Sequence, residues 1–341
     1  MSTVRVGLVG CGVMGAHYAR VLSACETAVL HAVCDLDPSR LEPFADQWSI
    51  PTHFPDHAAM LAAGGLDAVV VATPDFAHCA PVCDSLAAGC AVLCEKPLAT
   101  TIADADQIVE AAAAAGVPFM VNFGNRHRAN VRRIRQALQD EELGRVQHVD
   151  VRLNERIGKT FTLPWLEQTS PVWFLLSHCV DLVTWLLGEN LAVVHARSAL
   201  GRVAQHAPGV PDLVTCLAWT ESGTGVFLES SWALPDNYPG DIDFALQVLG
   251  TRGMLQADLL PHDLHITTPE GSMARDYSMD VTLPGGRVLG WWEESVRTFV
   301  RGVATGERLE PDAAQGREVT RALIAMDRSL ETGAPAAVSE V

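Results

Sequence analysis

Lysine is almost absent from this sequence. Of its 24 Lys and Arg residues only two are lysines, Lys96 and Lys159. Arginine carries nearly all of the positive charge, and unlike lysine it does not give up its proton in proteins. Lys96 comes soon after a short apolar run that we expect to form a buried strand. A lysine in that position is a candidate for proton transfer.

Long apolar runs and an excess of positive charge are missing as well. No run approaches the length of a membrane span. The formal net charge of -17 argues against a nucleic acid or an anionic membrane as the main partner. The first strand pattern begins within a few residues of Met1, so we expect no signal peptide. We expect a small-molecule substrate.

The nine cysteines are an odd number, they are scattered, and no CxxC motif occurs. Most lie within apolar runs, where a thiol behaves as a small hydrophobic group. We therefore expect reduced cysteines, a cytoplasmic protein and no metal site.

The strongest pattern lies in the first forty residues. An apolar run leads into the turn GCGVMG at residues 10–15, then a helical pattern, a second apolar run and Asp35. This order is typical of a dinucleotide-binding unit, in which the helix N-terminus receives the pyrophosphate. A carboxylate at Asp35 suits the free 2′-hydroxyl of NAD and repels the 2′-phosphate of NADP, so the sequence favours NAD.

Further apolar runs at residues 66–72, 90–94 and 117–123 alternate with helical patterns, while residues 51–57 indicate a loop. Alternation over residues 4–123 predicts a doubly wound parallel sheet, in which ligands bind beyond the carboxyl ends of the strands. The candidate cofactor-binding residues are those of the turn and the strand ends: Gly10, Gly12, Val13, Met14, Gly15, Asp35, Thr73, Pro74, His78, Glu95, Lys96 and Asn122.

After residue 123 the pattern changes to two helices, then successive strands without helices between them, then two closing helices at residues 290–303 and 312–330. Successive strands of this kind predict an antiparallel sheet. The expected fold class is α/β, with a nucleotide-binding domain at residues 1–123 and a second domain at residues 124–341.

Together these motifs resemble the Gfo/Idh/MocA oxidoreductase family, named after glucose–fructose oxidoreductase and inositol dehydrogenase. The matching segments are GCGVMG with CDLD, ATPDFAH, ALAAGCAVLCEKPLA, NFGNRHR and SHCVDLVTWLLG. The resemblance implies an N-terminal Rossmann domain and a C-terminal α/β domain with a large, mainly antiparallel open sheet, through which a homodimer or homotetramer would form. It also implies NAD(P)-dependent oxidation or reduction at a secondary hydroxyl of a sugar, cyclitol or sugar derivative.

By this resemblance Lys96 matches the catalytic lysine of the family, His178 the histidine of the substrate-side helix, and Asp181 the acid three residues further on. Phe174 stands where many members carry an aspartate four residues before that histidine, and Asp181, one turn beyond it, shares its helix face. We expect Lys96, helped by His178, to act as a general acid/base. The candidate substrate-binding residues are Lys96, Arg126, Arg156, Trp165 and His178.

The predicted function is an NAD-dependent oxidoreductase, and two alternatives use the same fold. An NAD-dependent glycoside hydrolase would retain its NAD and regenerate it within one turnover. A non-enzymatic NAD-sensing regulator would not need Lys96 for proton transfer. Lys96 in a structural ion pair, His178 as a core histidine and Trp165 as a packing residue are the corresponding structural alternatives.

Overall fold

The computed structural model describes residues 3–259, 264–268, 271–275, 279 and 281–341. The chain divides into two compact units. Unit 1 comprises residues 1–124 and 279–317, and unit 2 comprises residues 125–278 and 318–341. The second part of the chain is therefore not the single continuous domain that the sequence predicted, because a returning segment belongs to unit 1.

Unit 1 contains the predicted parallel sheet, in the order β3-β2-β1-β4-β5-β6. Its strands are β1 (Val4–Val9), β2 (Ala28–Cys34), β3 (Thr52–Phe54), β4 (Ala68–Val71), β5 (Ala91–Cys94) and β6 (Phe119–Val121). Its helices are α1 (Val13–Ser23), α2 (Pro38–Trp48), α3 (His57–Ala63), α4 (Cys79–Ala87), α5 (Ile102–Ala115) and, from the returning segment, α9 (Trp291–Thr305). The short strands β15 (Val281–Thr282) and β16 (Val288–Leu289) pair with each other.

Strand β3 corrects the sequence analysis, which expected only a loop at residues 51–57. It pairs in parallel with β2 at the edge of the sheet, and two of its three residues are exposed. Because an edge strand of this kind buries little, it lacks the apolar run that reveals a central parallel strand.

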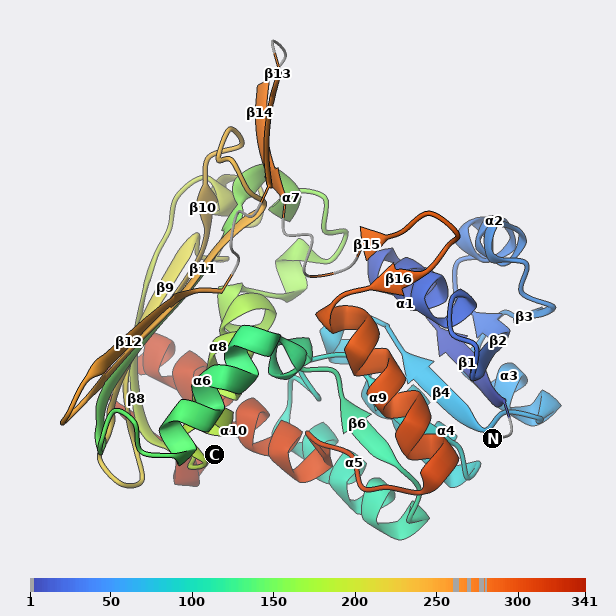
Figure 1. Cartoon of the computed structure of the whole chain (residues 1–341), viewed down its shortest axis with the longest axis horizontal. Helices are drawn as coiled ribbons and strands as arrows, with labels where there is room; N and C mark the ends of the chain where they lie inside the picture. Colours follow the sequence, from blue (N-terminus) through green and yellow to red (C-terminus); the bar gives the residue numbers. More distant parts are fainter. Residues whose placement is uncertain (1–2, 260–263, 269–270, 276–278, 280) are drawn as a thin grey trace. The chain divides into compact units, whose positions relative to one another are not determined.

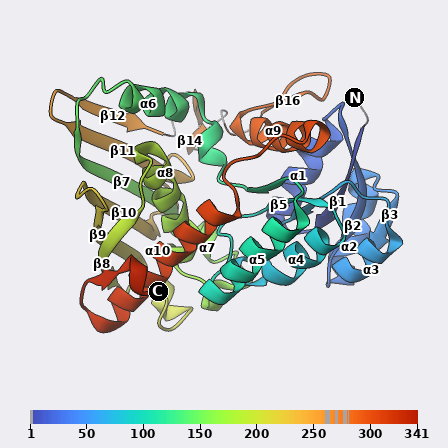
Figure 2. The same cartoon turned by 90° about the horizontal axis from the view of Figure 1, so that it is seen from below.

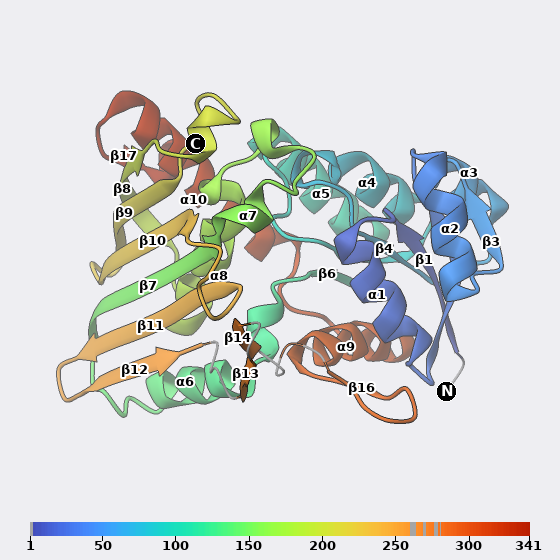
Figure 3. The ribbon, with the colours of Figure 1, turned by 90° about the horizontal axis from the view of Figure 1, so that it is seen from above.

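Helix α9 completes the hydrophobic core of unit 1. Trp292, Val296 and Phe299 are buried in one cluster with Tyr18 of α1 and Leu8 of β1. Figures 2 and 3 show α1 and α9 on one face of the parallel sheet and α4 and α5 on the other. The returning segment is therefore held in unit 1 by its apolar helix face.

Unit 2 is built on a seven-stranded sheet in the order β12-β11-β7-β10-β9-β8-β17. These strands are β7 (Val146–Arg156), β8 (Leu191–Ala199), β9 (Leu213–Thr220), β10 (Gly225–Leu234), β11 (Ile242–Gly250), β12 (Met254–Asp258) and β17 (Ala336–Ala337). Only the β7–β10 pair is parallel among the strand pairs of this sheet within the described residues. A separate hairpin consists of β13 (Leu264–Thr268) and β14 (Gly271–Arg275). The mainly antiparallel sheet confirms the predicted fold class.

The helices of unit 2 gather on one face of its sheet (Figure 1). They are α6 (Ala129–Gln139), the short α7 (Ile157–Thr160), α8 (Ser177–Leu187) and the second part of α10 (Ala313–Thr332). One turn of π-helix, Val172–Leu176, leads into α8. No helix in the described part of the chain combines the length and hydropathy needed to cross a membrane.

Candidate active site

The glycine-rich turn between β1 and α1 has the geometry that a pyrophosphate requires. Gly10 has a φ of +105°, and a Cβ on Gly15 would lie 2.1 Å from the carbonyl oxygen of Gly10. A side chain at either position would therefore displace the backbone. No side chain caps the N-terminus of α1 at Gly12. Its N–H groups can therefore receive an anion, and these residues fit a dinucleotide.

Asp35 lies at the end of β2 and holds the glycine-rich turn. Its Oδ2 accepts a hydrogen bond from Cys11 N at 2.7 Å, and its Oδ1 accepts one from Asp37 N at 2.8 Å. Burial and the neighbouring Asp35 raise the pKa of the Cys11 thiol to about 12, so Cys11 is a packing group and not a nucleophile. Each carboxylate oxygen keeps acceptor capacity for a ribose hydroxyl.

The predicted strand-end residues of β4 and β5 are joined by His78. Its Nδ1 lies 2.8 Å from the carbonyl oxygen of Pro97, and its Nε2 lies 3.1 Å from that of Thr73. The ring is buried. His78 thus binds backbone rather than presenting its ring to solvent, and it fixes the segment that follows Lys96. Pro74 precedes the 3-10 turn Asp75–Ala77 in the same connection.

Glu95 and Asn122, at the ends of β5 and β6, are bonded to each other inside unit 1. Asn122 Nδ2 donates to Glu95 Oε1 at 3.2 Å and to Tyr18 Oη at 2.5 Å, and Tyr18 Oη donates to Glu95 Oε1 at 2.5 Å. Ser295 Oγ on α9 donates to Asn122 Oδ1 at 2.7 Å. Burial and Glu95 raise the pKa of Tyr18 well above its ordinary value, so the phenol keeps its proton.

Sequence reasoning did not identify Tyr18 and Ser295. A tyrosine on an apolar helix face does carry a signal, since a buried hydroxyl needs a partner, but the sequence does not name that partner. Lys96 itself is half-buried, and its backbone N–H donates to Glu95 Oε2 at 3.1 Å. The lysine is therefore attached at its backbone to this buried cluster.

The predicted residues of unit 2 include a buried ion pair. Arg126 Nη2 lies 2.5 Å from Asp181 Oδ1, and Arg126 Nε donates to both carboxylate oxygens at 3.1 Å. The Arg126 guanidinium carbon lies 5.5 Å from the ring centroid of Trp185. Burial raises the pKa of Asp181, and the charge of Arg126 offsets part of that shift. Arg126 is thus paired with Asp181 in this structure.

His178 stands in the first turn of α8 and is half-buried. Its Nδ1 lies 3.4 Å from Asn125 Nδ2, and Asn125 Oδ1 accepts from Arg128 Nε at 2.9 Å. The ring of Phe174 packs on that of Trp232, with 5.9 Å between centroids. An aromatic contact therefore occupies the position for which the resemblance implies a carboxylate in many family members.

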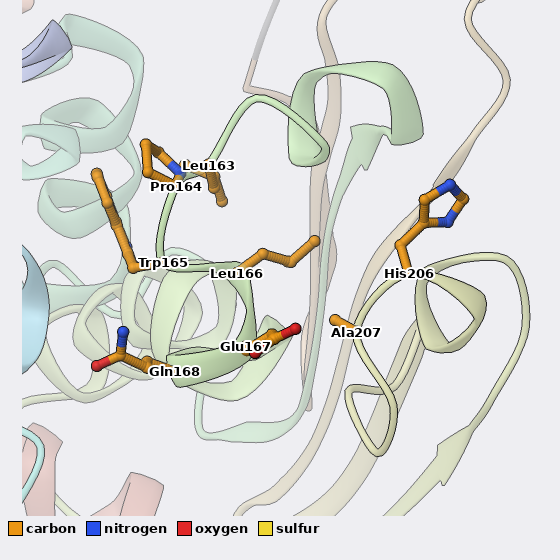
Figure 4. Close-up of a pocket in the computed structure, with 8 residues that line it drawn as sticks. All are labelled: Leu163, Pro164, Trp165, Leu166, Glu167, Gln168, His206 and Ala207. Carbon is orange, nitrogen blue, oxygen red and sulfur yellow. The ribbon is translucent and has the colours of Figure 1, made fainter.

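Two other predicted substrate-binding residues lie elsewhere in unit 2: Arg156 is the last residue of β7, and Trp165 lies in a loop. Arg156 pairs with Asp241, and its Nε is buried without a hydrogen-bond partner in the structure. Trp165 lines a pocket of about 220 Å³ (Figure 4). Leu163, Pro164, Trp165, Leu166, Glu167 and Gln168 come from one loop, and His206 and Ala207 from another. The ring of Phe161 packs against that of His206 in a tilted arrangement, with 4.3 Å between the ring centroids, and this contact joins the two loops.

The structure brings together several of the predicted residues within each unit. In unit 1 these are Glu95, Lys96 and Asn122, and in unit 2 they are Arg126 and Asp181. Arg156 and Trp165 occupy other parts of unit 2. Among the described residues no group of three or more His, Cys, Asp or Glu side chains could hold a metal ion.

Two family models match the chain. The model described as "Oxidoreductase family, NAD-binding Rossmann fold" matches residues 4–123, and "GFO/IDH/MocA C-terminal domain" matches residues 131–256. Inositol 2-dehydrogenase from Acidothermus cellulolyticus is 30% identical, over 97% of this chain and 93% of that protein. Myo-inositol 2-dehydrogenase from Thermotoga maritima is 24% identical, over 99% of both chains.

Among solved structures, GenD2 from gentamicin A biosynthesis in complex with NAD matches with a TM-score of 0.86 and 25% identity, over 99% of this chain and 97% of that chain. The nearly full-length match at 30% identity and the two family models agree with the glycine-rich turn and the two sheets. The chain therefore belongs to the Gfo/Idh/MocA oxidoreductase family and is a nicotinamide-dependent dehydrogenase or reductase acting on CH–OH groups.

Proposed function

We propose that the protein oxidises, or in reverse forms, a secondary hydroxyl group of a cyclitol or sugar with NAD, and that Lys96 is the general acid/base. The observation that carries this proposal is the position of Lys96, half-buried after β5 with its backbone bonded to the buried Glu95. The relatives named inositol 2-dehydrogenase support a cyclitol substrate.

In the oxidation that we propose, the Lys96 amine takes the proton of the substrate hydroxyl while hydride leaves the carbon that bears this hydroxyl. Bound NAD supplies the hydride acceptor. We propose that His178 assists this proton transfer, as the sequence predicts, and that the Arg126–Asp181 pair holds the helix that carries His178. In the reverse reaction Lys96 returns the proton to the oxygen of the ketone.

The test is the appearance of NADH absorbance when the protein is mixed with NAD⁺ and a cyclitol, a free sugar, a sugar acid or a nucleotide-linked sugar. We expect NADH to form with myo-inositol or scyllo-inositol. No absorbance change with any compound, together with NAD that stays bound through purification, would instead support the hydrolytic or regulatory alternative.

We propose that Asp35 selects NAD over NADP. Exchanging Asp35 for serine removes the negative charge that repels a 2′-phosphate. It also removes a strong hydrogen-bond acceptor for the ribose hydroxyls. The ratio of kcat/KM for NAD to that for NADP should then fall by about ten- to a hundred-fold. Asp37→Ser is the matched control, because serine also caps α2 and Asp37 is exposed. An unchanged ratio in Asp35→Ser would reject this role.

We also propose a homodimer or homotetramer formed through the helix-free face of the unit 2 sheet. Leu217 and Trp219 lie two residues apart on β9 and therefore share one face of the sheet, and their exposed fractions are 48% and 44%. Large apolar side chains on one sheet face are typical of an interface. Trp219→Glu should yield a monomer in light scattering after gel filtration, whereas Leu200→Glu, in an exposed loop, should not. A wild-type monomer would contradict the proposal.

The nine cysteines are all free thiols, which supports a reducing compartment. We therefore propose that the protein works in the cytoplasm.

A further inference from the structure

Four buried polar side chains from four elements meet at the carboxyl ends of β5 and β6. Tyr18 comes from α1, Glu95 and Asn122 follow the two strands, and Ser295 comes from α9. Their exposed fractions are 0%, 5%, 1% and 0%. We call this set the Tyr18 cluster. Its hydrogen bonds range from 2.5 to 3.2 Å, and none of its side chains is needed to explain the dinucleotide turn.

We propose that the Tyr18 cluster is a positioning device for Lys96, and this inference rests on the proposed function of Lys96. Tyr18, Asn122 and Ser295 are positioning residues that act through Glu95 and touch neither substrate nor cofactor. In this role Glu95 and Asn122 are buried residues that position Lys96, whereas the sequence analysis expected them to bind the cofactor.

The geometry explains why a lysine needs such a support. Its side chain has four rotatable carbons, so the position of its amine depends on how firmly its backbone is held. Glu95 Oε1 accepts from Tyr18 and Asn122, and Glu95 Oε2 accepts from the Lys96 backbone N–H at 3.1 Å. Both carboxyl oxygens are therefore engaged, and the carboxyl links the cluster directly to the lysine backbone.

The other side of Lys96 is held as well. The carbonyl oxygen of Pro97, the next residue, lies 2.8 Å from the buried ring of His78. The segment 95–97 is thus anchored before and after the lysine. Displacement of a catalytic group by about 1 Å can lower a rate by about a hundred-fold, so loss of one anchor should reduce turnover without reducing NAD affinity.

A double-mutant cycle tests whether the cluster acts through Lys96. Tyr18→Phe in the wild-type background should lower kcat by about ten- to a hundred-fold, with the Kd for NAD changed less than about two-fold. In the Lys96→Ala background the same exchange should change the residual kcat by less than about two-fold. Equal losses in both backgrounds would show a merely structural role and overturn the proposal.

Ser295→Ala gives a milder variant that guards against misfolding of Tyr18→Phe. We expect it to lower kcat by about five- to ten-fold and to show the same dependence on Lys96. Its matched control is Ser85→Ala, which removes another fully buried serine hydroxyl of unit 1, bonded at 2.6 Å to the carbonyl oxygen of Pro81. Equal effects of Ser295→Ala and Ser85→Ala on kcat would overturn the proposal.

A second readout needs no substrate and separates this inference from the proposed function. Because Lys96 and Lys159 are the only lysines, limited acetylation with acetic anhydride followed by mass spectrometry compares two amines within one protein. Exposed Lys159, paired with Glu155 at 3.1 Å, is the internal reference. Tyr18→Phe and Ser295→Ala should raise the ratio of the acetylation rate of Lys96 to that of Lys159 by at least about three-fold, and Ser85→Ala should leave it unchanged.

An unchanged ratio in all variants would overturn the positioning role even if the wild-type protein oxidised a cyclitol. A raised ratio with no dehydrogenase activity would instead reject the proposed function alone.

Discussion

Replacing Lys96 with alanine is expected to lower turnover by about two to four orders of magnitude while NAD binding stays unchanged. The acid/base group is lost, whereas the glycine-rich turn and Asp35, which we expect to hold the dinucleotide, are untouched. Steady-state kinetics on the substrate found in the absorbance screen gives kcat, and calorimetric titration with NAD⁺ gives the Kd.

Two further variants sharpen this experiment. Lys96→Arg keeps the positive charge but cannot exchange a proton, so its turnover should fall nearly as far as that of Lys96→Ala. Lys159→Arg replaces the other, exposed lysine with a cation that can keep the pair with the buried Glu155, and it should keep its activity within about two-fold of wild type. Turnover close to wild type in Lys96→Ala would reject Lys96 as the acid/base.

The second large effect concerns the Arg126–Asp181 pair. Arg126→Met should destabilise the protein by about 3–5 kcal/mol, because it leaves the Asp181 carboxylate buried without its partner. The side chains of the two residues are 6% and 1% exposed, so water cannot replace the lost bonds. The free energy of unfolding is measured by urea denaturation.

Charge balance, rather than packing, should account for this loss. Arg126→Met combined with Asp181→Leu removes both charges and should recover most of the stability. Arg133→Met breaks an exposed pair with Glu142 on the same unit and should produce no measurable change. If Arg126→Met and Arg133→Met denatured at the same urea concentration, the buried pair would not have the importance that we assign to it.

Much of the fold followed from local sequence patterns. Apolar runs of four or more residues marked the buried parallel strands, and the glycine-rich turn with Asp35 marked the dinucleotide unit. The comparisons confirmed the family and a nicotinamide cofactor. The preference for NAD and the catalytic roles of Lys96 and His178 stay predictions. Edge strand β3 was missed because it buries too little to show an apolar run.

The sequence by itself determined the order of the buried strands and the helices in the first 123 residues, without edge strand β3, and it determined the chemistry of the turn and the isolation of Lys96 as one of two lysines. Only the tertiary structure decided that α9 returns to unit 1, that Tyr18 and Ser295 engage Glu95 and Asn122, and that Arg126 is bound to Asp181. The reason is physical. Turns and buried strands are encoded by neighbouring residues, whereas a buried hydroxyl or charge is satisfied by a partner far away in the sequence, 173 residues away for Ser295 and Asn122.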